Sequence, residues 1–260
     1  MNKVIVVKIG GATLGSHDTA LEDIVELQKQ GKSVVVVHGG GKLITEWLEK
    51  QGVATNFLRG ERVTDKPTLE VATGVLAGLV NKDITAAINA LGGKAAGISG
   101  VDGNLIEGEI REKEKGFVGA VTRVNTEVLN AVLGSGFIPV ISPIGMNSAK
   151  QGDEPSTLNY NADVIAGEIA AALEAGMLIF LTDVDGISDE EGRILPKLTA
   201  DEAKTLIESG VASGGMIPKI NACLKALTVN ASARIIDGRK SHALLNEFSG
   251  NGGGTKIGEE

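Results

Sequence analysis

The stretch Val34-Val35-Val36-Val37-His38-Gly39-Gly40-Gly41 decides the fold class of this chain. Four valines in a row show no alternation with polar residues, which is typical of a strand buried on both faces of a parallel sheet. Glycines follow at once, and a helical pattern begins at about Lys42. A buried strand, a glycine turn and a helix in this order predict a βαβ unit, and therefore an α/β sandwich.

The same alternation of strands and helices extends along the chain. Short runs rich in β-branched residues predict strands at residues 4–8, 33–38, 138–142, 178–182 and 234–236. Helical spacing of apolar residues predicts helices at residues 19–30, 42–51, 68–90, 126–133, 164–175, 200–209 and 219–230. Residues 104–124 differ, because two short apolar patches flank a charged run, and we expect them to form a hairpin appended to the sheet.

Composition and charge exclude several classes of protein. Lys and Arg number 25 against 33 Asp and Glu, and the resulting net charge of −8 argues against a nucleic-acid-binding surface. The single cysteine, Cys223, excludes an intrachain disulfide and a cysteine zinc cluster, and we interpret it as a buried small hydrophobe. No run approaches the ~18 apolar residues of a membrane span, and the apolar stretch at residues 4–7 is too short for a signal peptide. We therefore expect a cytoplasmic protein that binds neither membranes nor nucleic acids.

Two glycine clusters each follow a predicted strand. Gly10-Gly11 comes after the first strand, and Gly39-Gly40-Gly41 comes after the second. Glycines at a strand end let the backbone approach a ligand, and the N-terminus of the next helix offers free N–H groups to an anion. Tight turning alone is the alternative, but two clusters at one edge of a sheet favour a phosphate site. A Walker A loop is excluded, because Leu43 follows Gly41-Lys42 where that motif needs Ser or Thr.

Two lysines are candidates for the same site. Lys8 ends the first strand beside a glycine cluster, where it faces either solvent or a ligand. Lys219 follows a glycine loop at the start of a predicted helix, and on its own it is more typical of a solvated surface lysine.

The stretch Asn159-Tyr160-Asn161-Ala162-Asp163 precedes the helix predicted at residues 164–175. Asn and Asp at a helix start usually act as caps, but capping needs only one such residue. In an extended segment, the three alternate polar side chains share one face. An aspartate placed between two lysines is able to hold both ammonium groups in position.

At this point the chain resembles the N-acetyl-L-glutamate kinases of the amino acid kinase superfamily, over about residues 4–257. The similarity rests on six stretches that occur in the right order: Lys8-Ile9-Gly10-Gly11, His38-Gly39-Gly40-Gly41, Gly60-Glu61-Arg62-Val63-Thr64, Asn159-Tyr160-Asn161-Ala162-Asp163, Thr182-Asp183-Val184-Asp185-Gly186-Ile187 and Gly214-Gly215-Met216-Ile217-Pro218-Lys219.

The resemblance implies a three-layer αβα sandwich with a mainly parallel central sheet of about eight strands. It implies one continuous domain with two lobes, in which residues 1–175 bind the amino acid and form a homodimer through residues 68–90, and residues 176–260 bind the nucleotide. The seam agrees with the sequence, because the helix at residues 164–175 ends at Gly176, where a new strand begins.

The implied reaction is phosphorylation of the side-chain carboxylate of N-acetyl-L-glutamate by MgATP, an early step of arginine biosynthesis. This acceptor is already ionised at pH 7 and needs no general base, so catalysis depends on alignment and charge stabilisation. By the family pattern, Lys8 and Lys219 flank the moving phosphoryl group and Asp163 orients them. The backbone N–H groups of Gly11, Gly40 and Gly41 complete the cradle.

The resemblance also assigns binding residues. Arg62 takes the α-carboxylate of the substrate, and Asn159 and Asn161 support the same molecule. The nucleotide lies against Asp183, Val184, Gly186, Ile187, Ser188, Val211, Ser213 and Met216. Mg²⁺ is expected to be held by phosphates and water, without a metal ligand from the protein.

Several alternatives remain open at this point. A sister kinase acts on an amino acid attached to an acidic carrier protein, and carbamate, aspartate, glutamate and UMP kinases share the fold. A non-catalytic amino-acid sensor on this fold is disfavoured, because Lys8, Asp163 and Lys219 are all present. Arginine-inhibited members have an extra helix before the first strand and His in place of Arg234, although Glu247 is shared. We therefore expect an arginine-insensitive homodimer.

Overall fold

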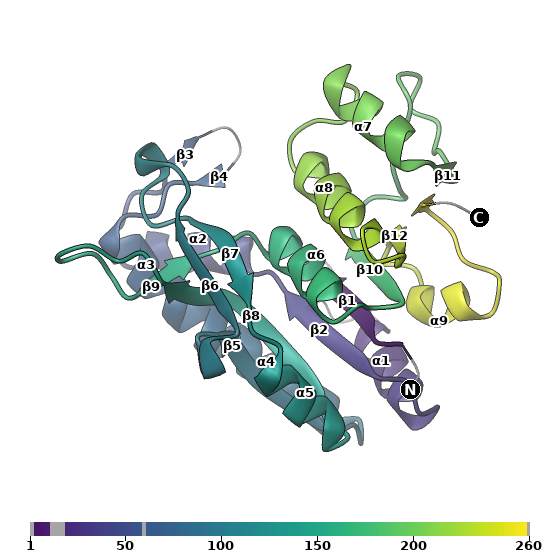
Figure 1. Ribbon diagram of the computed structural model, residues 1–260, viewed down its shortest axis with the longest axis horizontal. Helices are drawn as coiled ribbons and strands as arrows, with labels where there is room; N and C mark the ends of the chain where they lie inside the picture. Colours follow the sequence, from purple (N-terminus) through teal and green to yellow (C-terminus); the bar gives the residue numbers. More distant parts are fainter. Residues whose placement is uncertain (1–2, 11–18, 59–60, 259–260) are drawn as a thin grey trace.

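One sheet runs through the computed structural model, which describes residues 3–10, 19–58 and 61–258 (Figure 1). Its strands are β1 (Ile5–Ile9), β2 (Val34–His38), β5 (Ala95–Gly100), β6 (Ile106–Ile110), β7 (Gly119–Val124), β8 (Ile138–Asn147), β9 (Thr157–Asn159), β10 (Met177–Thr182), β11 (Lys197–Leu198), β12 (Ser232–Asp237) and β13 (Thr255–Ile257). Their order is β11-β13-β12-β10-β1-β2-β8-β6-β7, and both β5 and β9 also pair with β8. The central strands β12, β10, β1, β2 and β8 are parallel.

Helices cover both faces of this sheet. One layer contains α1 (Ala20–Lys29), α2 (Gly41–Lys50), α3 (Lys66–Thr73), η1 (Gly74–Val80), α4 (Asn81–Ala90) and α9 (Ala243–Phe248). The other layer contains α5 (Glu127–Gly134), α6 (Ala162–Ala172), α7 (Ala200–Glu208) and α8 (Met216–Leu227). Side chains alternate between the two: in β2, Val34 and Val36 pack toward the first layer, and Val35 and Val37 toward the second. The predicted three-layer α/β sandwich is confirmed.

The predicted strands and hairpin agree with the structure. Eight of the eleven strands described in this sheet have five residues or more, and β9, β11 and β13 have two or three. The hairpin expected at residues 104–124 is the antiparallel pair β6–β7, joined to the sheet by the parallel pairing of β6 with β8. A smaller hairpin, β3 (Phe57–Leu58) and β4 (Glu61–Arg62), lies outside this sheet.

The helix predicted at residues 68–90 is continuous from Lys66 to Ala90 and includes the π-helical turns of η1. It begins earlier than predicted because Asp65 caps it, accepting a hydrogen bond from the Thr68 N–H at 2.9 Å. By length and composition alone it is long and apolar enough to cross a membrane, a property that core helices share. Its inner face, including Ile88, is buried against the sheet.

The strand β5 and the helix α9 were missed from the sequence, as were the short strands β3, β4, β9, β11 and β13. The strand β5 has the composition Ala-Ala-Gly-Ile-Ser-Gly, which has weak β propensity, and it forms because it pairs with β8 along its whole length. The short helix α9 forms where it docks on α1. There, His242 Nδ1 lies 2.7 Å from Asp23 Oδ1, and the Leu245 N–H donates to Asp23 Oδ2 at 3.3 Å.

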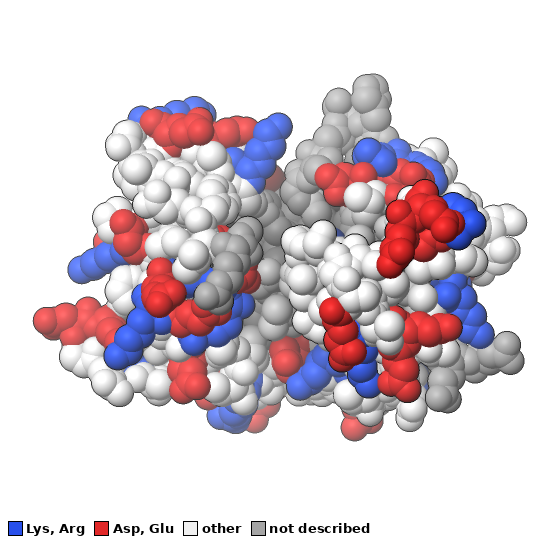
Figure 2. Space-filling view, turned by 90° about the horizontal axis from the view of Figure 1, so that it is seen from above, with Lys and Arg blue, Asp and Glu red and all other residues white. Residues whose placement is uncertain are grey.

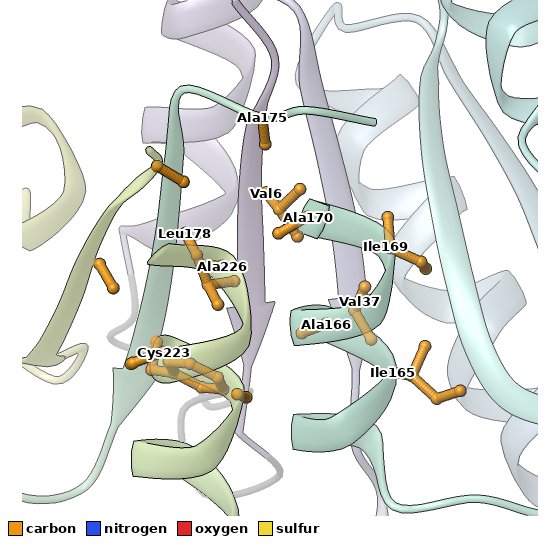
Figure 3. Close-up of a cluster of buried hydrophobic side chains, with 14 of the residues drawn as sticks. Val6, Val37, Ile165, Ala166, Ile169, Ala170, Ala175, Leu178, Cys223 and Ala226 are labelled. Carbon is orange, nitrogen blue, oxygen red and sulfur yellow. The ribbon is translucent and has the colours of Figure 1, made fainter. Parts of the chain in front are cut away.

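The core beside α6 and α8 is made of small and aliphatic side chains (Figure 3). Val6 projects from the sheet beside Ala170 of α6, and Val37 projects near Ile165 and Ala166. Cys223 of α8 is fully buried in this cluster, and burial raises the pKa of its thiol. The interpretation of Cys223 as a buried small hydrophobe is therefore confirmed.

Candidate active site

Two lysines share one buried aspartate at the carboxyl edge of the sheet. Lys8 Nζ lies 2.7 Å from Asp163 Oδ1, and Lys219 Nζ lies 2.9 Å from Asp163 Oδ2. Lys8 and Asp163 expose only 7% and 6% of their surfaces. The structure therefore brings together three side chains that the sequence holds in separate stretches.

Helix capping places Asp163. The Asn161 side-chain oxygen accepts hydrogen bonds from the N–H groups of Asp163, at 2.8 Å, and Val164, at 3.3 Å. Asp163 thus lies in the first turn of α6, and the prediction of an extended segment with three side chains on one face is wrong for this residue. The capping bonds turn the chain into a helix at Ala162, and a carboxylate in the first turn also interacts favourably with the helix dipole.

Close packing of α6 on α8 brings Lys219 to the same carboxylate. A Cβ at position 167 would lie 2.7 Å from the Ala222 Cα, so the two helices approach this closely only because residue 167 is glycine. Asp163 and Lys219 each lie about one helical turn before this crossing, where they face each other. The helix α8 begins at Met216 rather than at residue 219, which puts Lys219 in its first turn.

The cluster carries a net positive charge. Burial alone would raise the pKa of Asp163, but the charges of Lys8 and Lys219 outweigh it and hold this pKa below its ordinary value of 3.8. The carboxylate is therefore ionised at neutral pH, and it balances only one of the two ammonium groups. The remaining positive charge suits an anion.

A pocket of about 280 Å³ opens beside this cluster. Most residues that the sequence assigned to catalysis and substrate binding line it: Lys8, Gly40, Gly41, Arg62, Asn159, Asn161 and Asp163. Lys219 contributes through Asp163 and is not itself in the pocket wall. Gly11, which was also predicted, lies outside the described residues.

The turn Gly39-Gly40-Gly41 presents backbone donors to this pocket. Gly41 is the first residue of α2, where an N–H group has no partner within the helix. Among the described residues, neither the Gly40 N–H nor the Gly41 N–H finds a hydrogen-bond acceptor. A Cβ at Gly40 would lie 2.6 Å from Leu76 Cδ2, so the turn packs directly on η1. Two such donors at a helix N-terminus are suited to an anion.

Arg62 reaches the same pocket from the β3–β4 hairpin. Its Nη2 donates to Gly41 O at 2.9 Å and to Thr45 Oγ1 at 2.7 Å, and its guanidinium lies 4.9 Å from the centre of the Phe57 ring. Its Nη1 is buried and has no hydrogen-bond partner among the described residues. A buried charged donor without an acceptor is costly, so this nitrogen is suited to an acceptor that a ligand supplies.

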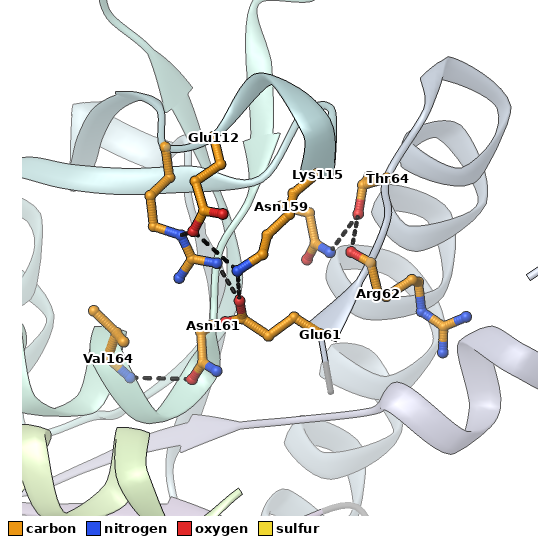
Figure 4. A network of polar contacts seen from close by, with 9 residues as sticks. Glu61, Arg62, Thr64, Glu112, Lys115, Asn159, Asn161 and Val164 are labelled. Atoms are coloured by element: carbon orange, nitrogen blue, oxygen red, sulfur yellow. Dashed lines mark hydrogen bonds and ion pairs between the residues drawn. The ribbon is translucent and has the colours of Figure 1, made fainter. Parts of the chain in front are cut away.

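A charged cluster that the sequence did not predict surrounds Glu61, next to Arg62 (Figure 4). Glu61 accepts hydrogen bonds from Arg111 and from Lys115, whose Nζ lies 2.5 Å from Glu61 Oε2. Burial would raise the pKa of Glu61, but these two cations outweigh it and lower the pKa. Glu61 therefore lines the pocket as a carboxylate whose charge is already balanced. The charged run at residues 111–115 is typical of an exposed turn, and only the structure shows that Lys115 is buried.

Tyr160 anchors the two asparagines beside it. A Cβ at Gly119 would lie 2.3 Å from the Tyr160 ring, and the Tyr160 hydroxyl donates to a β8 carbonyl at 2.6 Å. On one side, Asn159 Nδ2 donates to Thr64 Oγ1 at 3.3 Å, as Figure 4 shows. On the other side, Asn161 begins the cap of α6. The buried ring thus fixes the chain that carries both substrate-site predictions.

The residues predicted for the nucleotide lie beyond this pocket. Those that follow β10 are Asp183, Val184, Gly186, Ile187 and Ser188, and those that precede or begin α8 are Val211, Ser213 and Met216. Gly186 is packed against β13, because a Cβ there would lie 2.8 Å from Thr255 Oγ1. The Met216 N–H donates to Ser213 O at 3.1 Å. Since β10 is the parallel neighbour of β1, the loop after it lies at the same edge as Lys8.

Comparison with known proteins agrees with this arrangement. The sequence pattern of the amino acid kinase family matches residues 3–237. The chain is 48% identical over 260 residues to an acetylglutamate kinase of Dehalococcoides mccartyi, covering 99% of this chain and 96% of the relative. The chain belongs to the acetylglutamate kinases of the amino acid kinase family. An acetylglutamate kinase of Nostoc sp. is 46% identical, covering 98% of this chain and 87% of that one.

Solved structures show the same fold. An N-acetylglutamate synthase of Neisseria gonorrhoeae, complexed with coenzyme A and N-acetyl-glutamate, is 28% identical with a TM-score of 0.83. The match covers 99% of this chain and 60% of the synthase. A carbamate kinase of Giardia lamblia bound to AMP-PNP has a TM-score of 0.70 at 16% identity, with 100% and 99% of the two chains covered, and this likeness concerns the fold alone.

Proposed function

We propose that this chain transfers a phosphoryl group from ATP to the side-chain carboxylate of N-acetyl-L-glutamate, a step of arginine biosynthesis. The observation that carries the proposal is that Lys8 and the unpaired Nη1 of Arg62 belong to the walls of one pocket. A substrate with two carboxylates satisfies both cations. Curated relatives 41–48% identical over nearly the whole chain bear the name acetylglutamate kinase.

The pocket also explains why the amino group of the substrate is acetylated. Free glutamate carries an α-ammonium group, which needs a carboxylate partner when it leaves water. Among the described residues, two carboxylates line this pocket, and both are engaged: Asp163 with two lysines and Glu61 with Arg111 and Lys115. The acetamido group of N-acetyl-L-glutamate is neutral, so it makes no such demand.

In the proposed reaction, the substrate carboxylate attacks the γ-phosphorus of ATP, a carboxyl oxygen–phosphorus bond forms and the bond to the ADP oxygen breaks. The attacking group is already ionised at neutral pH, so no base takes a proton. Lys8 and the N–H groups of Gly40 and Gly41 stabilise the charge on the transferring group from one side, and Lys219 stabilises it from the nucleotide side. Asp163 is a positioning residue, because it holds both ammonium groups at fixed places.

The nucleotide is proposed to lie over the loop after β10 and the start of α8, so that residues 176–260 form a nucleotide lobe. Mg²⁺ is proposed to enter with ATP, held by phosphate oxygens and water. The chemistry of the site fits this, since both oxygens of Asp163 contact lysines. Within the described part of the chain, no three His, Cys, Asp or Glu side chains gather as metal ligands.

We also propose that the chain works as a cytoplasmic homodimer formed through the long helix from Lys66 to Ala90. That helix leaves Leu79 38% exposed, and Trp47 of the adjacent α2 is 37% exposed. A small-molecule substrate needs no nucleic-acid surface, and acidic and basic side chains are interspersed on the face shown in Figure 2.

Acyl phosphate formation, trapped as the hydroxamate, tests the proposal. N-acetyl-L-glutamate and free L-glutamate are compared with wild type and with Arg62→Lys, which keeps the charge but loses the planar fork. We expect strong preference for the acetylated substrate and a KM raised about 10–100-fold in the variant with kcat little changed, because a ground-state contact is weakened. Equal turnover of both amino acids would refute the substrate assignment. An unchanged KM would refute the role of Arg62.

A further inference from the structure

Two polar side chains, His38 and Asn81, are completely buried beneath the glycine turn. Neither lines the pocket, and neither is used in the reaction proposed above. His38 ends β2 and Asn81 begins α4, directly after the π-helical turns of η1. Buried polar groups are costly unless they are hydrogen-bonded, so their partners indicate why they are there.

The surroundings of Asn81 leave one orientation for its amide. Lys82 Nζ, which only donates, lies 3.1 Å from Asn81 Oδ1. The carbonyl oxygens of Ile98 and Val140, which only accept, lie 3.1 and 2.9 Å from Asn81 Nδ2. The amide oxygen therefore points toward Lys82, and the NH₂ group points toward β5, β8 and His38.

This orientation determines the tautomer of His38. Its Nε2 lies 3.2 Å from Asn81 Nδ2, an amide nitrogen that cannot accept a hydrogen bond, so a proton on Nε2 would find no acceptor there. Its Nδ1 lies 2.8 Å from the Gly39 carbonyl oxygen, which is an acceptor, so Nδ1 carries the proton. The ring is neutral at pH 7, because burial lowers the pKa of His38 to about 4. Geometry and charge thus agree on one form, with the proton on Nδ1.

The bond from His38 to Gly39 orients the next peptide. In a trans peptide the C=O and N–H groups point in opposite directions, and the described part of the chain contains no cis peptide. Holding the Gly39 carbonyl toward His38 therefore turns the Gly40 N–H away from it. The same contact keeps a carbonyl oxygen, which repels anions, from facing the pocket that Gly39, Gly40 and Gly41 line.

We propose that His38 and Asn81 are positioning residues for phosphoryl transfer, which aim the Gly40 N–H at the anion by holding the Gly39 carbonyl on the far side of the turn. This inference rests on the proposed function. It assigns the buried pair a task that the pocket residues do not perform, because a turn of three glycines has many accessible backbone conformations and needs an external group to select one. The link to Asn81 also connects the turn to the long helix.

Two substitutions at one position separate the two ring nitrogens. The amide nitrogen of His38→Asn occupies the place of Nδ1 and still donates to Gly39, whereas His38→Gln places its amide near Nε2 and loses that donor. We expect kcat of the Asn variant within about tenfold of wild type, because one ordinary hydrogen bond is lost. We expect kcat of the Gln variant about 10²-fold below wild type with KM little changed, because an oriented transition-state donor is lost. If His38 has only a structural role, the two variants should have the same kcat when each is assayed at the same interval below its own unfolding midpoint. That result would overturn the proposal.

A second measurement does not depend on variant folding. The chain has three histidines, so ¹⁵N spectra of wild type at pH 7, with His38 assigned by its loss in His38→Asn, report the tautomer directly. A neutral ring protonated at Nδ1 supports the proposal. A ring protonated at Nε2, or a charged ring, would overturn it. If wild type fails to phosphorylate N-acetyl-L-glutamate, the proposed function falls and the positioning role falls with it, whereas an active wild type with equal variants removes only the positioning role.

Discussion

Replacing Asp163 with Asn tests the electrostatic centre of the site, because it removes one buried charge with almost no change of shape. Asp163 is 6% exposed and its two oxygens lie 2.7 and 2.9 Å from two ammonium groups. Removing one partner of a buried ion pair costs about 3–5 kcal/mol, since the other charge stays buried without compensation. Asn still accepts one hydrogen bond, so we expect the lower value, about 3 kcal/mol. For a chain of this length, that lowers Tm by about 6–12 °C.

Activity should fall further than stability alone explains. Without the carboxylate, the two like-charged ammonium groups repel, and a displacement of about 1 Å at a reacting centre costs on the order of 10²-fold in rate. We therefore expect kcat to fall about 10²-fold when it is measured well below the Tm of the variant. The assay is hydroxamate trapping at saturating N-acetyl-L-glutamate, alongside urea unfolding.

The pH dependence of the stability difference checks the cause. The folded pKa of Asp163 lies below its ordinary value of 3.8, so its charge stabilises the fold above that value. The difference in unfolding free energy between wild type and Asp163→Asn should be constant from about pH 5 to pH 8. It should shrink as pH falls below 3.8 toward the folded pKa. A difference that grew on acidification would refute the reasoning.

A matched control lies on the same two helices. Glu168 of α6 and Lys225 of α8 form an ion pair at 3.1 Å, with side chains 26% and 46% exposed. Such a partly exposed pair is worth less than about 1 kcal/mol, so Glu168→Gln should cost little stability and leave kcat unchanged. If Asp163→Asn behaved like Glu168→Gln in both assays, the shared carboxylate would have no special role.

Three further changes test other parts of the structure. Lys115→Gln weakens the neutralisation of Glu61, so a carboxylate with less balanced charge faces an anionic substrate, and KM for N-acetyl-L-glutamate should rise several-fold. Because Lys115 is buried and pairs with Glu61 and Glu112, the free energy of unfolding should also fall, by up to about 3 kcal/mol. An unchanged KM would contradict the idea. Gly167→Val places side-chain atoms against Ala222. Urea unfolding should show that the free energy of unfolding falls by about 1–3 kcal/mol, and the activity assay should show a reduced kcat. An unchanged free energy of unfolding would mean that the two helices separate without cost. His242→Gln removes a side chain whose pKa is raised by its hydrogen bond to the buried Asp23 carboxylate on α1. The free energy of unfolding of wild type should therefore exceed that of the variant below pH 6.5, and this difference should disappear as pH rises through the folded pKa of His242. A difference that does not depend on pH would rule this out.

Much of the fold was predictable because it depends on local pattern. Runs such as Val34-Val35-Val36-Val37 are buried on both faces wherever they are placed, so they indicate a parallel sheet and two covering helix layers without any knowledge of contacts. The strand β5 was missed for the opposite reason. Its small residues have little intrinsic preference, and its Gly97 leaves room for the Asn81 amide, whose oxygen would lie 2.3 Å from a Cβ there. Only the partner strand makes that segment a strand.

The site was predictable in membership and only partly in geometry. Family resemblance and residue type selected Lys8, Asp163, Lys219 and Arg62, and the structure places them at or beside one pocket. The alternation of polar residues before α6 wrongly suggested an extended segment at Asp163, because the capping hydrogen bonds of Asn161 stabilise the start of a helix there. The roles assigned to these residues, to Gly11 and to the nucleotide loops stay predictions.

The sequence by itself determined the layered α/β fold, the place of the glycine turn at the end of β2 and the choice of charged residues, since these follow from periodicity and from residue chemistry. Tertiary structure alone decided which charges meet. Whether Lys219 is a surface lysine or half of a buried cluster depends on the approach of α6 and α8 at Gly167, and whether Glu61 repels or tolerates an anion depends on two cations about fifty residues away in the chain. Electrostatic energy depends on the distance between charges and on their burial, and neither quantity can be read from the sequence alone.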